Sequence, residues 1–226
     1  MAPLDRYKRP SDLPPRLPVF PLRGAILLPR ATLPLNVFEP RYLAMLDDVM
    51  SGMRVIGIIQ PTHAPADVES PAGRAVDLKR VGCAGRVTTY QELDDGRLVI
   101  TLTGIMRFET IDEAATAAPY RVMSVSYDRF VKDLAEGYGE EQIDRNRLLG
   151  VLRTYLDANR LSADWSAILS APTEYLVNAL SVMSPYGPEE KQALLEALDL
   201  KSRADVLVAL TEMELASGGS SGGRLQ

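Results

Sequence analysis

The spacing of apolar residues is strand-like in the first half of the chain and helical in the second half. In the first half, the run Arg54–Gln60 is rich in β-branched residues and lies between Gly52 and Pro61, which is typical of a buried strand. After about residue 131, apolar residues such as Leu148 and Leu152 recur every three to four positions, as they do on one face of a helix. This change of period predicts a β-rich half followed by a helical half.

A β-hairpin is predicted at the dipeptide Asp95-Gly96, because Asp-Gly supplies the positive φ angles of a tight turn. The flanking segments, Arg80–Glu92 and Arg97–Thr103, are strand-like. Further strand-like segments at short spacing bring the expected total to about five or six, which is typical of a small barrel or sandwich. One helix interrupts the strands, and Pro40 is suited to its first turn.

These patterns predict the α+β fold class and divide the chain into four parts. A Pro-rich N-terminal arm over residues 1–16 precedes a β-barrel domain over residues 17–130, and a helical bundle follows over residues 131–216. Residues 217–226 are rich in Gly and Ser, so we expect a disordered tail there.

The net charge of −5 is concentrated in the helical half. Residues 131–216 hold 15 Asp and Glu against 8 Lys and Arg, and the arginines of the β-rich half have no interleaved aromatic residues. Both features disfavour a nucleic-acid interface, which needs positive charge and stacking platforms. No apolar stretch approaches the roughly 18 residues of a membrane span, so we expect a cytoplasmic protein that does not enter a membrane.

Residues that often carry catalysis are scarce. The chain has one cysteine, Cys83, and one histidine, His63, so neither a disulfide within the chain nor a Cys/His metal site is expected. A Ser-His-Asp arrangement would rest on His63 alone. The one Lys-Ser pair, Lys201-Ser202, has no glycine-rich loop before it, so no phosphate-binding loop is predicted. We therefore expect no catalytic residue, no cofactor and no metal.

Several short motifs resemble the N-terminal, substrate-recognition domain of Lon proteases, and in order they cover residues 17–212. They include Leu17-Pro-Val-Phe-Pro-Leu22, Leu33-Pro-Leu35, Phe38-Glu-Pro-Arg-Tyr42 and Gly104-x-x-Arg107-Phe108. The resemblance implies a distorted β-barrel of the PUA-like type followed by a helical bundle. It also implies a non-catalytic module that binds unfolded or partner polypeptides, as an adaptor or accessory in protein quality control. The ATPase and Ser-Lys peptidase domains of the full enzymes have no counterpart in these residues.

Two other functions stay open on the sequence. Barrels of the PUA-like type also occur in proteins that bind nucleic acid. An RNA-associated module is therefore an alternative, although the charge pattern disfavours it. A hydrolase with an unrecognised serine or carboxylate site is the third hypothesis.

The candidate polypeptide-binding residues are aliphatic side chains hemmed in by prolines at positions 21, 29 and 34. They are Ile26, Leu27, Leu28 and Leu33. Because proline has no N–H, such a segment cannot fully join a sheet. Two interpretations follow: the segment presents apolar side chains at the surface, or it closes the core of the barrel.

The most specific motif of the resemblance is expected to be structural. Its residues are Phe38, Glu39, Pro40, Arg41 and Tyr42. We expect Glu39 and Arg41 to cap the helix and to pair with each other or with the barrel. Phe38 and Tyr42 are expected to anchor the helix.

Overall fold

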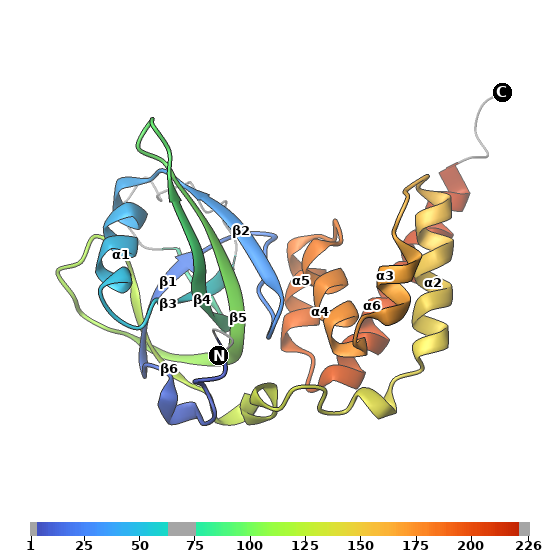
Figure 1. Cartoon of the computed structure of the whole chain (residues 1–226), viewed down its shortest axis with the longest axis horizontal. Helices are drawn as coiled ribbons and strands as arrows, with labels where there is room; N and C mark the ends of the chain where they lie inside the picture. The colour runs from blue at the N-terminus through green and yellow to red at the C-terminus, as the bar shows by residue number, and fades with distance from the viewer. Residues whose placement is uncertain (1–3, 63–75, 222–226) are drawn as a thin grey trace.

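A computed structural model describes residues 4–62 and 76–221 of the chain. A curved sheet forms one part of the molecule and a group of helices forms the other (Figure 1). The strands are β1 (Arg16–Pro21), β2 (Thr32–Val37), β3 (Val55–Pro61), β4 (Leu78–Glu92), β5 (Leu98–Glu113) and β6 (Val122–Ser126).

The sheet closes on itself as an irregular barrel. Its strand order is β2-β5-β4-β3-β1-β6, and β6 pairs with β5 as well as with β1. The β1–β3 pair is parallel and the other pairs are antiparallel. The predicted hairpin joins β4 to β5, and Gly96 has a φ of 80° in its turn. The long strand β5 contacts β2, β4 and β6, so it organises the barrel.

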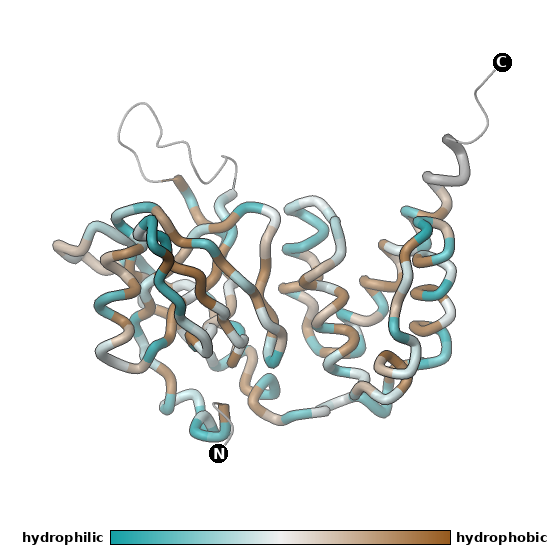
Figure 2. The backbone as a smooth tube through the Cα atoms, turned by 45° about the horizontal axis from the view of Figure 1, so that its top comes forward, coloured by the Kyte–Doolittle hydropathy of each residue, from teal (hydrophilic) through white to brown (hydrophobic). Residues whose placement is uncertain are grey.

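One helix, α1 (Pro40–Met50), lies against the barrel as predicted, and the remaining α-helices follow β6. Apolar residues, brown in Figure 2, occur in the interior of both parts. In the bundle, α6 packs against α2, α4 and α5. The short 3-10 helices are η1 (Pro10–Asp12), η2 (Asp128–Leu134) and η3 (Glu140–Gln142), and the bundle helices are α2 (Arg145–Ala158), α3 (Trp165–Ser170), α4 (Thr173–Met183), α5 (Pro188–Glu196) and α6 (Leu200–Ser221).

The end of α6 corrects one sequence prediction. Residues 217–221 were expected to begin a disordered tail, but the helix continues through them to Ser221. A helix that is already formed adds one backbone hydrogen bond for each residue that joins it, which offsets the poor helix propensity of Gly and Ser. The remainder of the predicted tail, residues 222–226, lies outside the described residues.

The chain between β1 and β2 crosses β5 at very close range. Arg30 N–H donates to the carbonyl oxygen of Gly104 at 2.8 Å, and Gly104 N–H donates to the carbonyl oxygen of Ala31 at 2.9 Å. A Cβ atom on Gly104 would lie only 2.0 Å from the carbonyl oxygen of Leu28. Glycine is therefore required here by space, and the crossing holds the segment before β2 against the barrel.

A buried ion pair joins the barrel to the helical half. Arg107 of β5 donates from Nη2 to Asp133 Oδ1 at 2.8 Å and from Nε to Asp133 Oδ2 at 2.9 Å. From Nη1, the same guanidinium donates to the carbonyl oxygens of Leu195 and Ala197 at the end of α5. One barrel side chain thus contacts the connecting segment and the bundle together.

Replacing Gly104 by alanine is expected to lower the free energy of unfolding by about 2–3 kcal/mol, because the new methyl group must displace backbone. Urea denaturation measures the change. Gly150→Ala is the matched control, since a Cβ at Gly150 meets nothing within 4 Å and alanine favours a helix. Equal losses in the two variants would contradict the close-approach argument.

The variant Asp133→Asn is expected to lose about 3–5 kcal/mol of unfolding free energy, because it leaves the buried Arg107 charge uncompensated. The control is Asp95→Asn, which removes the carboxylate partner of Arg97 in the exposed hairpin turn and should cost much less, because solvent screens an exposed pair. Thermal or urea unfolding of both variants tests the difference. A loss at Asp133 as small as that at Asp95 would show that the buried pair does not hold the two halves together.

Candidate functional site

The proposed surface at the segment before β2 is not exposed. Ile26, Leu27 and Leu28 are 1%, 0% and 0% exposed and belong to the barrel core, and Leu33 is half-buried against that core. The surface interpretation is therefore wrong for the first three residues, and the core-closing interpretation describes them. The reason is the tight crossing over Gly104, which binds this segment to the barrel through backbone hydrogen bonds.

The motif around the start of α1 is structural in most of its residues. Arg41 pairs with Glu39, with Nη2 and Oε2 2.7 Å apart, and the ring of Tyr42 stacks on Phe20 at a centroid distance of 4.0 Å. Pro40 opens the helix, and Glu39 occupies the N-cap position, but its carboxylate accepts no hydrogen bond from a backbone N–H of the helix, so it does not cap α1 as expected.

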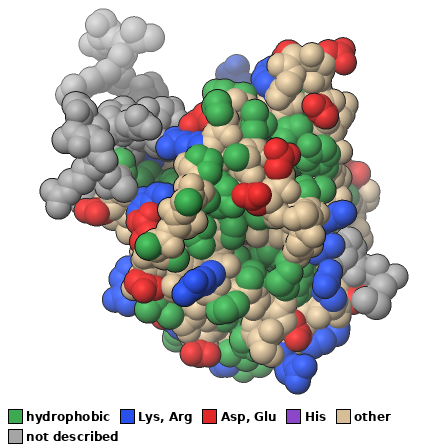
Figure 3. Space-filling model, turned by 90° about the vertical axis from the view of Figure 1, so that its left-hand side faces the viewer, with side chains coloured by type: hydrophobic (Ala, Val, Ile, Leu, Met, Phe, Trp, Pro, Cys, Tyr) green, Lys and Arg blue, Asp and Glu red, His purple; other side chains and the backbone are tan. Residues whose placement is uncertain are grey.

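Phe38 is the exception, because it is 63% exposed and does not anchor the helix. Successive side chains of a strand point to opposite faces. Val37, the last residue of β2, is buried, so the residue that follows it points outward. Apolar side chains, green in Figure 3, gather on this barrel end of the molecule and alternate with charged ones.

A continuous apolar groove of about 400 Å³ lies in the bundle instead. Its walls come from α2, from the end of α4 with the turn that follows, and from α6. Two of its side chains are well exposed, Leu161 at 53% and Met183 at 73%. The lining residues are Leu148, Val151, Leu152, Tyr155, Leu156, Leu161, Leu180, Met183, Ser184, Pro185, Tyr186, Leu207, Val208 and Thr211.

The few polar groups of the groove are hydroxyls at the α6 side. Tyr186 Oη and Thr211 Oγ1 lie 2.8 Å apart, and Thr211 Oγ1 donates to the carbonyl oxygen of Leu207. Burial, followed by the nearby Glu214 charge, raises the pKa of Tyr155. Burial likewise raises the pKa of Tyr186. The lining therefore holds no ionised side chain at neutral pH, and it suits apolar contact rather than proton transfer.

A buried lysine supports the wall formed by the end of α4. Lys191 of α5 donates from Nζ to the carbonyl oxygens of Ser181 and Val182, at 2.9 and 2.5 Å. These carbonyl oxygens belong to the last turn of α4, where no following N–H of the helix is available to donate to them. Burial lowers the pKa of Lys191 to about 8. The contact fixes the turn that carries Met183 into the groove.

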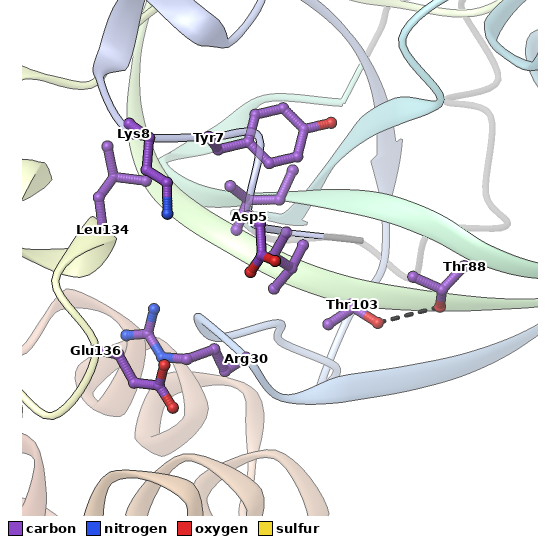
Figure 4. A pocket seen from close by; sticks show the side chains of 10 residues that line it. Asp5, Tyr7, Lys8, Arg30, Thr88, Thr103, Leu134 and Glu136 are labelled. Atoms are coloured by element: carbon purple, nitrogen blue, oxygen red, sulfur yellow. Dashed lines mark hydrogen bonds between the residues drawn. The ribbon is translucent and has the colours of Figure 1, made fainter. Parts of the chain in front are cut away.

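A second, more polar pocket of about 320 Å³ lies where the N-terminal arm meets the barrel (Figure 4). Arm residues Asp5 and Lys8 lie across it from Arg30 and Glu136. Arg30 is held in place by an ion pair with Glu174 and by the carbonyl oxygen of Asp133, to which its Nη1 donates at 2.8 Å. Through these two contacts Arg30 joins the segment before β2 to α4 and to η2.

The described residues offer no support for a metal centre or a reactive thiol. They contain no cluster of three or more His, Cys, Asp or Glu suited to a metal ion. Cys83 is fully buried, and this burial raises the pKa of its thiol, which disfavours the reactive thiolate. His63 lies outside the described residues. Over residues 4–62 and 76–221, no helix is long and apolar enough to cross a bilayer.

Sequence reasoning found the helix faces of the bundle but missed the groove. Leu148 and Leu152 recur with helical spacing, which predicted the apolar face of a helix. Periodicity shows that one face of a helix is apolar, but it does not show whether a neighbouring helix covers that face. The only further signal was the apolar Leu161 in the polar segment that follows α2.

Several curated proteins resemble this chain over most of its length. A Lon protease of Flavobacterium johnsoniae is 26% identical over 213 residues, which are 91% of this chain and 25% of that protein. A Lon protease of Anaeromyxobacter dehalogenans is 29% identical over 206 residues, which are 88% of this chain and 23% of that protein. The chain thus spans about a quarter of the length of the curated relatives it matches.

Two solved structures share the fold. One is a Lon N-terminal domain protein from Xanthomonas campestris, with a TM-score of 0.59 and 23% identity over 86% of this chain and 97% of that one. The other is the N-terminal domain of Mycobacterium avium complex Lon protease, with a TM-score of 0.54 and 15% identity over 87% of this chain and 98% of that one. They confirm the predicted α+β fold, with a barrel-like sheet and a helical part.

The family comparison covers almost the same residues as the motifs in the sequence. A model described as "ATP-dependent protease La (LON) substrate-binding domain" matches residues 16–212. Because this match takes in both the barrel and the bundle, the chain belongs to the family of Lon substrate-binding domains.

Proposed function

We propose that this chain recognises polypeptides and holds an unfolded segment with large apolar side chains in the groove of the bundle. The observation that carries the proposal is the groove itself, about 400 Å³ with a lining free of ionised side chains. This volume lies in the range of about 300–1,000 Å³ that is usual for ligand sites. Membership in a family of substrate-binding domains supports a substrate-recognition module.

The chemistry of the groove selects the occupant. Leu161 and Met183 expose apolar surface that a partner would cover, and burying one large aliphatic side chain contributes about 1.5–3 kcal/mol. Two or three such contacts sum to about 3–9 kcal/mol before the costs of association and of ordering a flexible segment, so the affinity is weak, no tighter than micromolar. Such an affinity suits a module that samples many unfolded chains and releases them.

The excess of acidic residues in the helical half further restricts the class of polypeptide that the groove can bind. Residues 131–216 hold 15 Asp and Glu against 8 Lys and Arg. Acidic segments are repelled by such a surface, whereas neutral or basic apolar segments are attracted. We therefore assign neutral or basic unfolded polypeptides as the preferred substrates.

The role that follows from this binding is that of an adaptor or accessory in protein quality control. Lon proteases are the curated relatives, and the present residues correspond to the part that the family model describes as substrate-binding. The described lining of the groove has no nucleophile paired with a base, which supports recognition without catalysis.

The test is a double variant, Leu161→Asp with Met183→Asp. It places charge in the groove at two exposed positions, so the fold should persist while binding falls at least tenfold. Fluorescence anisotropy with a labelled, reduced and carbamidomethylated lysozyme, which is unfolded and basic, measures the affinity.

The matched control is Met213→Asp with Leu198→Asp. Both residues are 68% exposed and neither lines the groove. Wild-type affinity in the control, together with the loss in the groove variant, supports the proposal. Equal affinity of the groove variant and the wild type would show that the polypeptide-binding site lies elsewhere on the molecule.

A further inference from the structure

Arg203, in the first turn of α6, carries an unusual buried charge. Only 2% of the residue is exposed. Its Nε donates to the carbonyl oxygen of Leu194 at 3.0 Å, and its Nη1 donates to Asn178 Oδ1 at 2.8 Å. Its Nη2 has no hydrogen-bond partner among the residues that the structure describes. A buried, charged donor without an acceptor is costly, and such atoms call for an explanation.

A small cavity of about 40 Å³ borders this guanidinium. It lies between the barrel, the connecting segment and the first turn of α6. One water needs about 10–15 Å³ of such space, so the cavity has room for a group of several atoms. Its charged lining residues are Arg30, Arg107, Arg129, Lys132, Arg203, Asp133, Glu174 and Asp199.

The three carboxylates of this lining already have donors within the protein. Asp133 accepts from the backbone and guanidinium of Arg107. Glu174 accepts from Arg30 and from the N–H of Gly137. They are therefore engaged with the walls of the cavity.

The third carboxylate, Asp199, accepts from the N–H of Ser202 and so caps α6. Of the five cationic side chains in the lining, Arg30, Arg107 and Arg129 are paired with Glu174, Asp133 and Glu109. This leaves Lys132 and Arg203 against the one carboxylate of Asp199. The positive end of the α6 helix dipole adds to this excess. The cavity therefore favours an anion.

We propose that this cavity binds a small inorganic oxyanion of the phosphate class, which accepts hydrogen bonds from Nη2 of Arg203. The N–H groups on Nη2 are charge-assisted donors, and the oxygen atoms of a phosphate-class anion are strong acceptors for such donors. The site is separate from the polypeptide groove and does not depend on its function.

The electrostatics of Arg203 agree with this assignment. Burial, and after it the charge of Arg107, lowers the pKa of Arg203 to about 9. An anion at Nη2 offsets both effects, because it restores a hydrogen-bond acceptor and neutralises part of the positive charge. Arg107 belongs to the barrel and Arg203 to the bundle, so a bound anion also holds these two parts together.

The first experiment measures the melting temperature of the whole chain as inorganic phosphate is added at constant ionic strength. A ligand that binds only the folded state stabilises it by RT ln(1 + [L]/Kd), so we expect a rise of several degrees that grows with the logarithm of the phosphate concentration above Kd. Chloride at the same ionic strength should give no comparable rise. No rise with phosphate, or an equal response to chloride, would overturn the proposal.

The matched variants are Arg203→Met and Arg97→Met. Arg203→Met should abolish the phosphate response, whereas Arg97→Met, in the exposed hairpin turn, should retain it. A full phosphate response in a folded Arg203→Met protein would refute the assignment of Nη2.

A measurement on the wild type covers the case in which Arg203→Met does not fold. Crystals soaked in selenate, a heavier tetrahedral oxyanion, should show an anomalous selenium peak about 4 Å from Arg203 Nη2, because one of its oxygen atoms then lies within hydrogen-bond distance of that nitrogen. A cavity filled with water alone at saturating selenate would overturn the proposal.

Discussion

The buried pair of Arg107 and Asp133 is the contact on which the relation between the two halves depends. The guanidinium and the carboxylate are 2% and 8% exposed, so both charges have been taken out of water at a large desolvation cost. That cost is offset because Asp133 accepts from the backbone N–H of Arg107 as well as from its side chain. The guanidinium also lies over the ring of Phe130, 4.2 Å from its centroid.

Further polar contacts between the barrel and the bundle surround the pair of Arg107 and Asp133. Asn178 donates to the carbonyl oxygen of Pro29 and accepts from Arg203, and Arg30 pairs with Glu174. The positive φ of Arg30, 61°, turns the chain directly after Pro29. The tight crossing over Gly104 thus has two effects: it closes the barrel core, and it presents backbone and side-chain groups to the bundle. The orientation of the apolar groove relative to the barrel follows from these contacts.

In the proposed function, recognition and rigidity belong to different parts of the molecule. The groove walls come from helices and one turn in the bundle, where Leu161 and Met183 remain accessible. The barrel and the joint hold most of the fully buried side chains and the buried ion pair. A surface that accepts many polypeptides needs exposed apolar groups, and a rigid neighbouring scaffold allows them without loss of the fold. This division agrees with a family named for substrate binding.

The sequence alone determined the types of element, the hairpin at Gly96, the change from strand to helix and the family resemblance, because all of these depend on local spacing or on short motifs. Only the tertiary structure decided that Ile26, Leu27 and Leu28 are buried and that Phe38 is exposed. It also decided where helix faces stay uncovered, and that Arg107 meets Asp133 and approaches Arg203. The physical reason is that burial and pairing depend on which distant segment packs against a residue. The periodicity of apolar residues along the chain does not identify that segment.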